Sequence, residues 1–254
     1  MITIICFVFV FLIIYMVYLT FSDTITYEVF EFEQLPETFS NFTIFFIADI
    51  HRRKVNIKTL LKVKERIDLV MIGGDLVERG VPLKRMQENI RLLKHWKVPI
   101  FFVWGNNDYE VDIEEMTEIL HEEKVIVLKD SYVKMKREID EINIIGLDYD
   151  ENFKKFPNVN WNNIDESFTL LLTHHPVSFY ELDEQMKQKV DLVLAGHTHG
   201  GQIRFFTFGL YPKGGIYYDA NIPIFITEGY GYTLLPFRFQ TNAQCHVIKL
   251  QKKV

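Results

Sequence analysis

Two short motifs in this chain place candidate metal ligands two residues apart. The stretch ADIHRR contains Asp49 and His51, and the stretch GHTHGGQ contains His197 and His199. In an extended backbone the side chains at positions i and i+2 point the same way, so both members of each pair can face one ion. Carboxylates and imidazoles are both ligands of divalent transition metals. The two motifs therefore indicate a metal site.

Three further polar residues are candidates to complete such a site. Asp75 follows two glycines in DLVMIGGD, and its two oxygens can bridge two cations about 3.5–4 Å apart. Asn106 offers a neutral carbonyl oxygen, and His174 offers an imidazole nitrogen. Mixed oxygen and nitrogen ligands favour Mn, Fe or Zn over Ca, which prefers sites made of oxygen alone.

Each of these motifs follows an apolar run of strand length. The runs are rich in β-branched and aromatic residues and end at polar residues or glycine, as buried strands do. They are TIFFIAD, DLVMIGGD, PIFFVWGN, FTLLLTH and DLVLAGH, which end at Asp49, Asp75, Asn106, His174 and His197. Ligands bind at the carboxyl ends of the strands in open α/β sheets, so we expect these residues to meet at one edge.

Amphipathic helical patterns separate the apolar runs. They cover about residues 55–66, 82–95, 111–123 and 177–188. Two more strands are expected, at TITYEVFEFE near residue 25 and at AQCHVIKL near residue 245. Strands that alternate with helices predict an α/β fold with largely parallel pairing.

The composition limits the class of protein. The chain has 254 residues, 48% of them hydrophobic, which is enough for one well-buried domain. Its net charge of −6 argues against general nucleic-acid binding, because neutralising phosphates requires a basic surface. We expect no disulfide framework, because Cys6 lies in an apolar run and Cys245 lies far along the chain.

The first 21 residues, MITIICFVFVFLIIYMVYLTF, carry no charged side chain. A helix of about 20 residues spans the ~30 Å hydrocarbon core of a bilayer, whereas a buried core helix of this length is uncommon. The segment lacks the basic region and the small-residue cleavage site of a secretory signal. We therefore expect an uncleaved, single-pass membrane anchor over residues 1–21 and one domain over residues 22–254. No Lys or Arg precedes Arg52, which favours a domain on the outer face.

The order of the motifs resembles that of the calcineurin-like metallophosphoesterases, which carry D-x-H, G-D, G-N-x-D, H and G-H-x-H. The stretch EGYGYTLLPFRF also resembles a block of their bacterial membrane-associated branch, and the resemblance runs from about residue 40 to the last residues. It implies a four-layer α/β/β/α sandwich around two divalent metal ions. The first metal would take Asp49, His51, Asp75 and His199. The second would take Asp75 as a bridge, with Asn106, His174 and His197.

The resemblance also implies an activity, the metal-dependent hydrolysis of phosphodiesters or phosphomonoesters. Two divalent cations clamp a phosphate, polarise its oxygens and lower the pKa of a water molecule between them. In-line attack on phosphorus then needs little from the side chains beyond positioning. Protonation of the leaving group is the remaining task.

The sequence departs from the family pattern at the residue that would protonate the leaving group. The pattern is G-N-H-D, in which the aspartate orients a histidine acid, but this chain has G-N-N-D. Asn107 occupies the place of the histidine, and Asp108 occupies the orienting position. An asparagine cannot exchange a proton near pH 7, and general acid catalysis is typically worth about 10²–10⁴-fold. His175, next to His174 in LLTHHP, is the nearest candidate acid, and a packing role is its alternative.

Substrate contacts are less well defined. Arg52 and Arg53 follow the first motif and Arg238 lies in LPFRF, so each could meet an anionic substrate or simply be solvated. The anchor favours a lipid-linked or cell-envelope phosphate ester, because such a substrate shares the membrane surface with the protein.

Other functions remain to be distinguished from phosphoesterase activity. A metal-binding pseudoenzyme with a regulatory or ligand-binding role could keep the ligands and lose the acid. The metallo-β-lactamase pattern H-x-H-x-D-H fits poorly, because HTHGGQ lacks the D-H pair. Amidohydrolases fit poorly as well, because they open with H-x-H and this chain opens with D-x-H.

Overall fold

The computed structural model describes residues 1–150 and 157–253. The helices in these ranges are α1 Ile2–Phe21, α2 Ile57–Leu60, α3 Leu83–Leu93, α4 Ile113–Glu122, α5 Val177–Tyr180 and α6 Glu184–Lys187. The strands are β1 Asp23–Phe32, β2 Phe42–Ile47, β3 Leu69–Ile72, β4 Ile100–Phe102, β5 Ile126–Val127, β6 Ser131–Arg137, β7 Asp140–Gly146, β8 Thr169–Thr173, β9 Leu192–Ala195, β10 Gly215–Asp219, β11 Ile222–Ile226 and β12 Ala243–Lys252.

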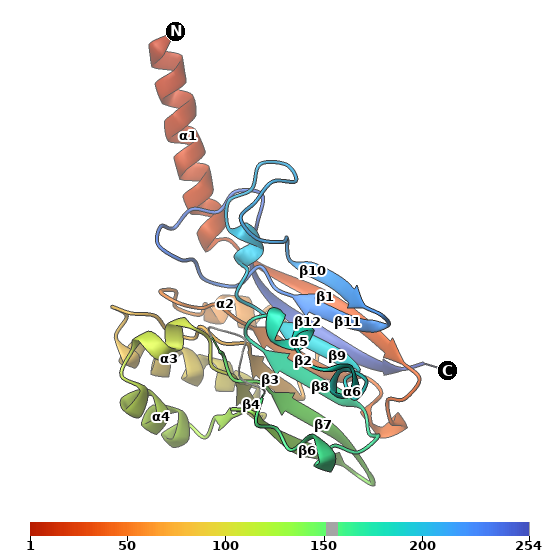
Figure 1. Cartoon of the computed structure of the whole chain (residues 1–254). Coiled ribbons are helices and arrows are strands. Elements are labelled where there is room, and N and C mark those ends of the chain that lie inside the picture. Colours follow the sequence, from red (N-terminus) through yellow and green to blue (C-terminus); the bar gives the residue numbers. More distant parts are fainter. Residues whose placement is uncertain (151–156, 254) are drawn as a thin grey trace.

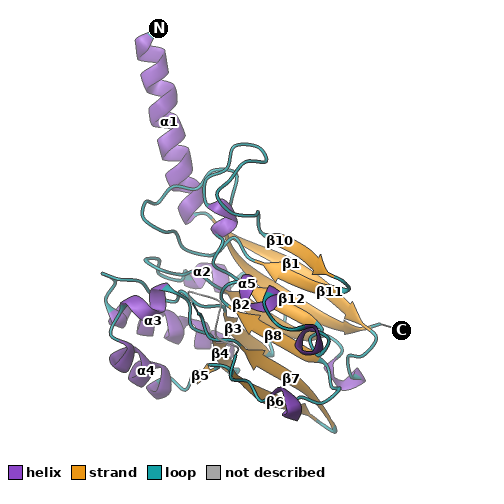
Figure 2. Cartoon of the chain, in the orientation of Figure 1, coloured by secondary structure: helices purple, strands orange, loops and turns teal. Residues whose placement is uncertain are grey.

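The strands form two six-stranded sheets (Figure 2). The first has the order β1-β12-β2-β3-β4-β5, and the second has the order β10-β11-β9-β8-β7-β6. Strands β2, β3 and β4 pair in parallel, as do β8 and β9. The expected parallel pairing is therefore confirmed for all five apolar runs. These runs nevertheless belong to two sheets, so the ligand residues meet where two sheet edges come together.

Three apolar clusters hold the layers together. Between the sheets lie aromatic side chains such as Phe46, Phe168 and Phe225. A second cluster packs the first sheet against α3 and α4, and a third packs the second sheet against Phe179 of α5. Strand β2 is buried at every position because it is covered on both faces. The expected four-layer α/β/β/α sandwich is confirmed.

Two of the predicted helices are shorter than their sequence patterns. The pattern over 55–66 gives only α2, which Asn56 caps through its side chain, and i→i+3 bonds from Lys62 and Val63 then close the chain into tight turns. The pattern over 177–188 splits into α5 and α6. The split follows from Asp183, which has an extended backbone and caps a new helix by accepting a bond from the Met186 N–H.

The structure also contains two antiparallel hairpins whose bounds the sequence patterns did not give, although further strands were expected between about residues 202 and 250. Strand β6 pairs with β7, and β10 pairs with β11. Most side chains of β6 and β10 are partly exposed, so their apolar patterns are weaker than those of the central strands. These hairpins complete the second sheet on both sides of β8 and β9.

Helix α1 projects away from the sandwich (Figure 1). It is long enough and apolar enough to cross a membrane, and Thr20 is its only buried residue. All its other residues, Cys6 included, are exposed or partly exposed. An exposed apolar surface of this length indicates a partner for the helix, and the composition is that of a membrane span.

Asp23 connects the end of α1 to the sandwich. Its Oδ1 accepts a 2.6 Å bond from Arg53 Nη2, and its Oδ2 accepts bonds from the hydroxyls of Thr59 and Tyr230 at 2.6 and 2.7 Å. Both side chains of the Asp23–Arg53 ion pair are almost fully buried. The guanidinium also lies over the rings of Phe21 and Tyr230. The network fixes the first residue of β1, two residues after the end of α1, against the loop that carries His51.

We expect Asp23→Asn to lower the free energy of unfolding by about 3–5 kcal/mol, because it leaves the Arg53 charge buried without its partner. Denaturant unfolding of the full chain in detergent measures the change. Glu88→Gln is the matched control, because it removes a carboxylate from the exposed Lys54–Glu88 pair and should leave stability almost unchanged. Equal stability of the two variants would contradict the structural role of the buried pair.

Candidate metal centre

The candidate ligands lie on turns at the ends of the strands, and several have strained backbones. Positive φ angles occur at Asp49 (55°), His51 (49°), Asp75 (49°), His197 (70°) and His199 (49°). Such left-handed conformations at residues other than glycine cost about 1–3 kcal/mol each and gather at functional sites. The extended backbone expected for the two i, i+2 motifs is therefore wrong. The turns instead aim each side chain separately.

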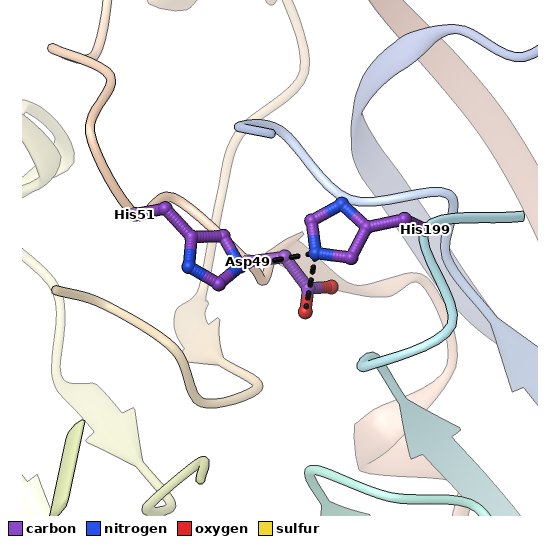
Figure 3. Close-up of side chains that lie close together, drawn as sticks. All are labelled: Asp49, His51 and His199. Carbon is purple, nitrogen blue, oxygen red and sulfur yellow. Dashed lines mark hydrogen bonds and ion pairs between the residues drawn. The ribbon is translucent and has the colours of Figure 1, made fainter. Parts of the chain in front are cut away.

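The first cluster consists of Asp49, His51 and His199 (Figure 3). The Nε2 atoms of the two histidines are 3.0 Å apart, and Nε2 of His199 is 3.5 Å from Oδ1 of Asp49. Asp49 also accepts bonds from the backbone N–H of His197 at 3.0 and 3.2 Å. All three side chains are buried. Their ligand atoms converge on one point.

The second cluster consists of Asp75, His174 and His197, with Asn106 beside them. Nε2 of His174 lies 3.3 Å from Oδ2 of Asp75 and 3.1 Å from Nδ1 of His197. The Asn106 side-chain oxygen is 3.1 Å from His174 Nε2 and 2.9 Å from His197 Nδ1. His197 and His199 thus join different clusters, as the family resemblance implied. The expectation from their spacing alone, that both face one ion, is wrong.

Asp75 lies between the two clusters. Its Oδ2 is 3.5 Å from Nε2 of His51 and 3.3 Å from Nε2 of His174. Its Oδ1 accepts a 2.8 Å bond from the backbone N–H of Asn107. Gly105 leaves room for this carboxylate, because a Cβ at that position would lie 2.2 Å from Asp75 Oδ1. Asp75 is therefore placed to serve both clusters.

Acceptor groups outside the two clusters contact the second ring nitrogen of two candidate histidine ligands. Nδ1 of His174 is 2.9 Å from the carbonyl oxygen of Gly73, and Nδ1 of His51 is 2.9 Å from Oε2 of Glu78. Partners of this kind set the tautomer and the orientation of metal-binding histidines. Glu78 was not predicted from the sequence, although it lies only three residues after Asp75.

The electrostatics of the centre fit a divalent cation. Burial opposes the charge of His174, but Asp75 and Asp49 outweigh this and raise its pKa to about 9. Burial opposes ionisation of Asp75 as well, but His174 and His51 outweigh it and lower the pKa of this carboxyl. Burial lowers the pKa of His197 to about 3, which keeps its imidazole neutral, as metal binding requires. The buried carboxylates thus need positive charge, which bound cations would supply in place of protons.

Two of the three arginines proposed to meet a substrate are buried. Arg53 is buried in the network around Asp23, as described above. Arg238 is fully buried. Its Nη2 donates to the carbonyl oxygens of Glu228, Gly229 and Gly231, and it lies 3.4 Å from Nδ1 of the candidate ligand His199. Both proposals are therefore wrong, because the guanidinium groups are committed to the interior. Arg52 keeps its side chain partly exposed and pairs with Glu78.

Asp108 and His175, two of the candidates for catalysis, differ in their surroundings. Asp108 is buried and accepts bonds from the backbone N–H groups of Val77 and Gly105, so it ties two ligand loops together. The ring of His175 lies 4.2 Å from the ring of His197, centroid to centroid, and its Nδ1 accepts a bond from the Val177 N–H.

A cavity of about 380 Å³ opens above the centre. Asp75, Asn106, Asn107, His197 and His199 line its polar end. Its outer wall is formed by Ile203, Leu210, Tyr211, Leu234, Leu235 and Phe237, among others. None of these apolar residues was assigned to the site from the sequence. They come from two loops with no regular pattern, so only the folded structure brings them to the ligands.

The comparison with known proteins agrees with this geometry. Residues 42–201 match the family model described as "Calcineurin-like phosphoesterase". The chain belongs to the calcineurin-like phosphoesterase family. This range contains all seven candidate ligands from Asp49 to His199, so the resemblance expected from the motifs is confirmed.

The chain is also similar in sequence to individual proteins, beyond the range that the family model covers. The Bacillus subtilis protein YpbG is 40% identical over 220 residues, which cover 82% of this chain and 80% of that protein. A Helicobacter pylori metallophosphoesterase is 30% identical over 214 residues, covering 75% of this chain and 53% of its own length. A zebrafish "Transmembrane protein with metallophosphoesterase domain" is 26% identical over 245 residues, covering 87% of this chain and 55% of its own length. The last of these is consistent with a membrane-associated branch.

We expect substitutions in the two clusters to change metal content in different ways. Asp75→Asn should lower binding to both clusters, whereas His199→Ala and His197→Ala should each leave about one bound metal, because each removes a ligand from one cluster. Elemental analysis of the Mn-reconstituted full chain measures the stoichiometry. His121→Ala, on the exposed face of α4, is the control and should keep two metals. A single metal in the unaltered chain would contradict the two-cluster assignment.

Proposed function

We propose that this protein is a membrane-anchored two-metal phosphoesterase that hydrolyses a phosphodiester or a phosphomonoester. The observation that carries the proposal is the pair of ligand clusters that meet at Asp75 at the base of a cavity. The first metal would be held by Asp49, His51, Asp75 and His199. The second would be held by Asp75, Asn106, His174 and His197. Bound Mn, Fe or Zn ions would polarise the phosphate and make hydroxide available near neutral pH.

Asn107 is proposed to position the phosphate. It lines the cavity, and its side-chain oxygen accepts a 2.8 Å bond from the Asn106 amide. This arrangement leaves the Asn107 NH₂ group to donate to a phosphate oxygen in the cavity. Its backbone N–H is bonded to Asp75. The residue would therefore contribute binding and orientation, because an amide cannot deliver a proton at neutral pH.

His175 is the remaining candidate acid among the proposed site residues. Burial and the neighbouring His174 lower its pKa to about 4. At pH 7 a group with this pKa is protonated in only about one molecule in a thousand. We therefore propose that departure of the leaving group depends mainly on the acidity of that group itself. Asp108 would act as a positioning residue, through its two bonds to the ligand loops.

The substrate is proposed to be a lipid-linked or cell-envelope phosphate ester. The apolar wall of the cavity supports this class, because it offers an apolar surface directly beside the polar end. Helix α1 would hold the domain at the membrane as a single-pass anchor, with the domain on the outer face. The substrate and the cavity would then share one surface.

A pseudoenzyme is the second candidate, and the asparagine at position 107 is the observation that favours it. Such a protein would bind metals and a phosphate ligand without turnover. The seven-ligand centre favours catalysis over this role, because simple ligand binding does not need two clusters with a shared carboxylate. Hydrolysis assays distinguish the two candidates.

We expect the metal-loaded full chain to hydrolyse aryl phosphate esters and to hydrolyse alkyl esters much more slowly. Asn107→His should raise alkyl turnover by about 10²–10⁴-fold and change aryl turnover little, because only the alkyl leaving group needs a proton. Steady-state rates on matched aryl and alkyl esters give the comparison.

Two variants serve as controls for the comparison of aryl and alkyl esters. Asp75→Asn should abolish hydrolysis of both esters, and His175→Gln should change both rates only slightly. A preference of the unaltered chain for alkyl esters would show that a proton donor is present after all. No hydrolysis of any ester with Mn, Fe or Zn would favour the pseudoenzyme.

A further inference from the structure

Two loops of the sandwich lie beside the last turns of α1 (Figure 1). They are residues 203–211, here the first rim loop, and residues 231–239, the second rim loop. The backbone N–H of Arg238 donates to the carbonyl oxygen of Met16 at 3.2 Å. The ring of Phe239 contacts Tyr15 of α1 on one side and Phe205 of the first rim loop on the other. The helix and the two loops therefore form one continuous surface.

The rim loops turn their charges inward and their apolar side chains outward. Arg204 is buried and donates to the carbonyl oxygens of Gly200, Thr207 and Tyr211. Arg238 is fully buried in the same manner. A loop that faces water normally has the opposite arrangement, with its charged groups solvated and its apolar groups buried.

The outward side chains are large, apolar and almost fully exposed. The exposed fraction is 87% for Phe206, 91% for Leu210 and 88% for Leu234. Phe208 at 79% and Leu235 at 58% extend the same patch. A contiguous apolar patch of this kind on a soluble surface marks an interaction site. Neither rim loop exposes an acidic side chain, since neither contains one.

The contact with α1 gives the depth of this patch relative to a bilayer. The 20 residues of α1 measure about 30 Å, which equals the hydrocarbon thickness and leaves no surplus. Met16 lies five residues before Phe21, and therefore about 7.5 Å along the helix axis from its end. When α1 spans a membrane, the rim loops consequently reach the level of the bilayer interface rather than the bulk water.

We infer that the two rim loops insert their exposed phenylalanine and leucine side chains into the interface of the bilayer that α1 spans. The bilayer is the occupant because the patch is continuous with the only helix among the described residues that is suited to a membrane. Apolar and aromatic side chains bind at this boundary in other peripheral segments. The inference rests on the proposed anchoring by α1 and does not depend on catalysis.

Insertion of the rim loops would determine the route by which a substrate enters the cavity. Leu210, Leu234 and Leu235 belong both to the exposed patch and to the wall of the cavity above Asp75 and Asn107. The mouth of the cavity therefore faces the lipid headgroups. A phosphate ester with an apolar tail can enter along the rim loops without passing through bulk water.

Fluorophore labelling tests whether the rim loops insert into the bilayer. The full chain is reconstituted in nanodiscs that each hold one copy of it. The label, nitrobenzoxadiazole, is attached to Leu234→Cys or Phe206→Cys in a Cys6→Ser background. Cys245 resists alkylation at neutral pH, because it is buried and burial raises its pKa to about 12. Ile139→Cys is the matched control, since Ile139 is an equally exposed apolar residue in the turn between β6 and β7, at the end of the sandwich remote from α1 (Figure 1).

Quenching by nitroxide-labelled lipids and by aqueous iodide is then compared. We expect lipid quenching at positions 206 and 234 to be several-fold stronger than at 139 and close to that of a label on Cys6 in α1. Lipid quenching at positions 206 and 234 that only equals that at 139, while the Cys6 label is still quenched, would overturn the insertion of the rim loops. It would leave the anchoring by α1 in place. A label at 234 shielded from both quenchers would also overturn the insertion, because another copy of the chain would then cover the patch. An unquenched Cys6 label would overturn the anchoring and the inference together.

Discussion

The position of the Asp75 carboxylate between two histidines is the interaction on which the centre depends. His51 follows a strand of the first sheet and His174 follows a strand of the second, and both face the same Oδ2 of Asp75 at 3.5 and 3.3 Å. The two sheets must therefore pack in one register for the site to exist. The strained turns at the ligands persist because rigid, fully buried strands precede them, and Gly105 keeps the space that the carboxylate needs.

In the proposed mechanism, the asparagine at position 107 alters the chemistry and leaves the position of the Asp75 carboxylate intact. The bond that Asp75 receives comes from the backbone N–H of Asn107, which any residue other than proline can donate. A histidine and an asparagine are therefore equivalent for holding the carboxylate, and they differ in the groups that they present to the cavity and to Asn106. This separation explains how the chain can keep a full set of ligands while lacking the usual acid. Under the proposed function, the identity of the leaving group, more than binding, should decide which phosphate esters react.

Much of the fold could be predicted from the sequence, because five short apolar runs each end in a polar ligand residue. The division of these runs between two sheets needed the family resemblance, since periodicity does not say which strands pair. Left-handed turns replace the extended backbone in both i, i+2 motifs. Asp49 and His51 still lie in one cluster, whereas His197 and His199 do not, so spacing alone could not assign the histidines. Arg53 was misassigned because its partner Asp23 lies 30 residues away in the sequence. Arg238 was misassigned because the backbone carbonyl groups that bury it carry no sequence signal. The apolar wall of the cavity lies on irregular loops and carries no sequence pattern.

The central claim is that Asp75 bridges two metal ions, and anomalous diffraction from crystals of the Mn-reconstituted chain tests it most directly. The account predicts two Mn peaks about 3.5–4 Å apart with Asp75 between them. One peak should contact Asp49, His51 and His199, and the other should contact Asn106, His174 and His197. A single peak, or two peaks of which only one contacts Asp75, would contradict the account.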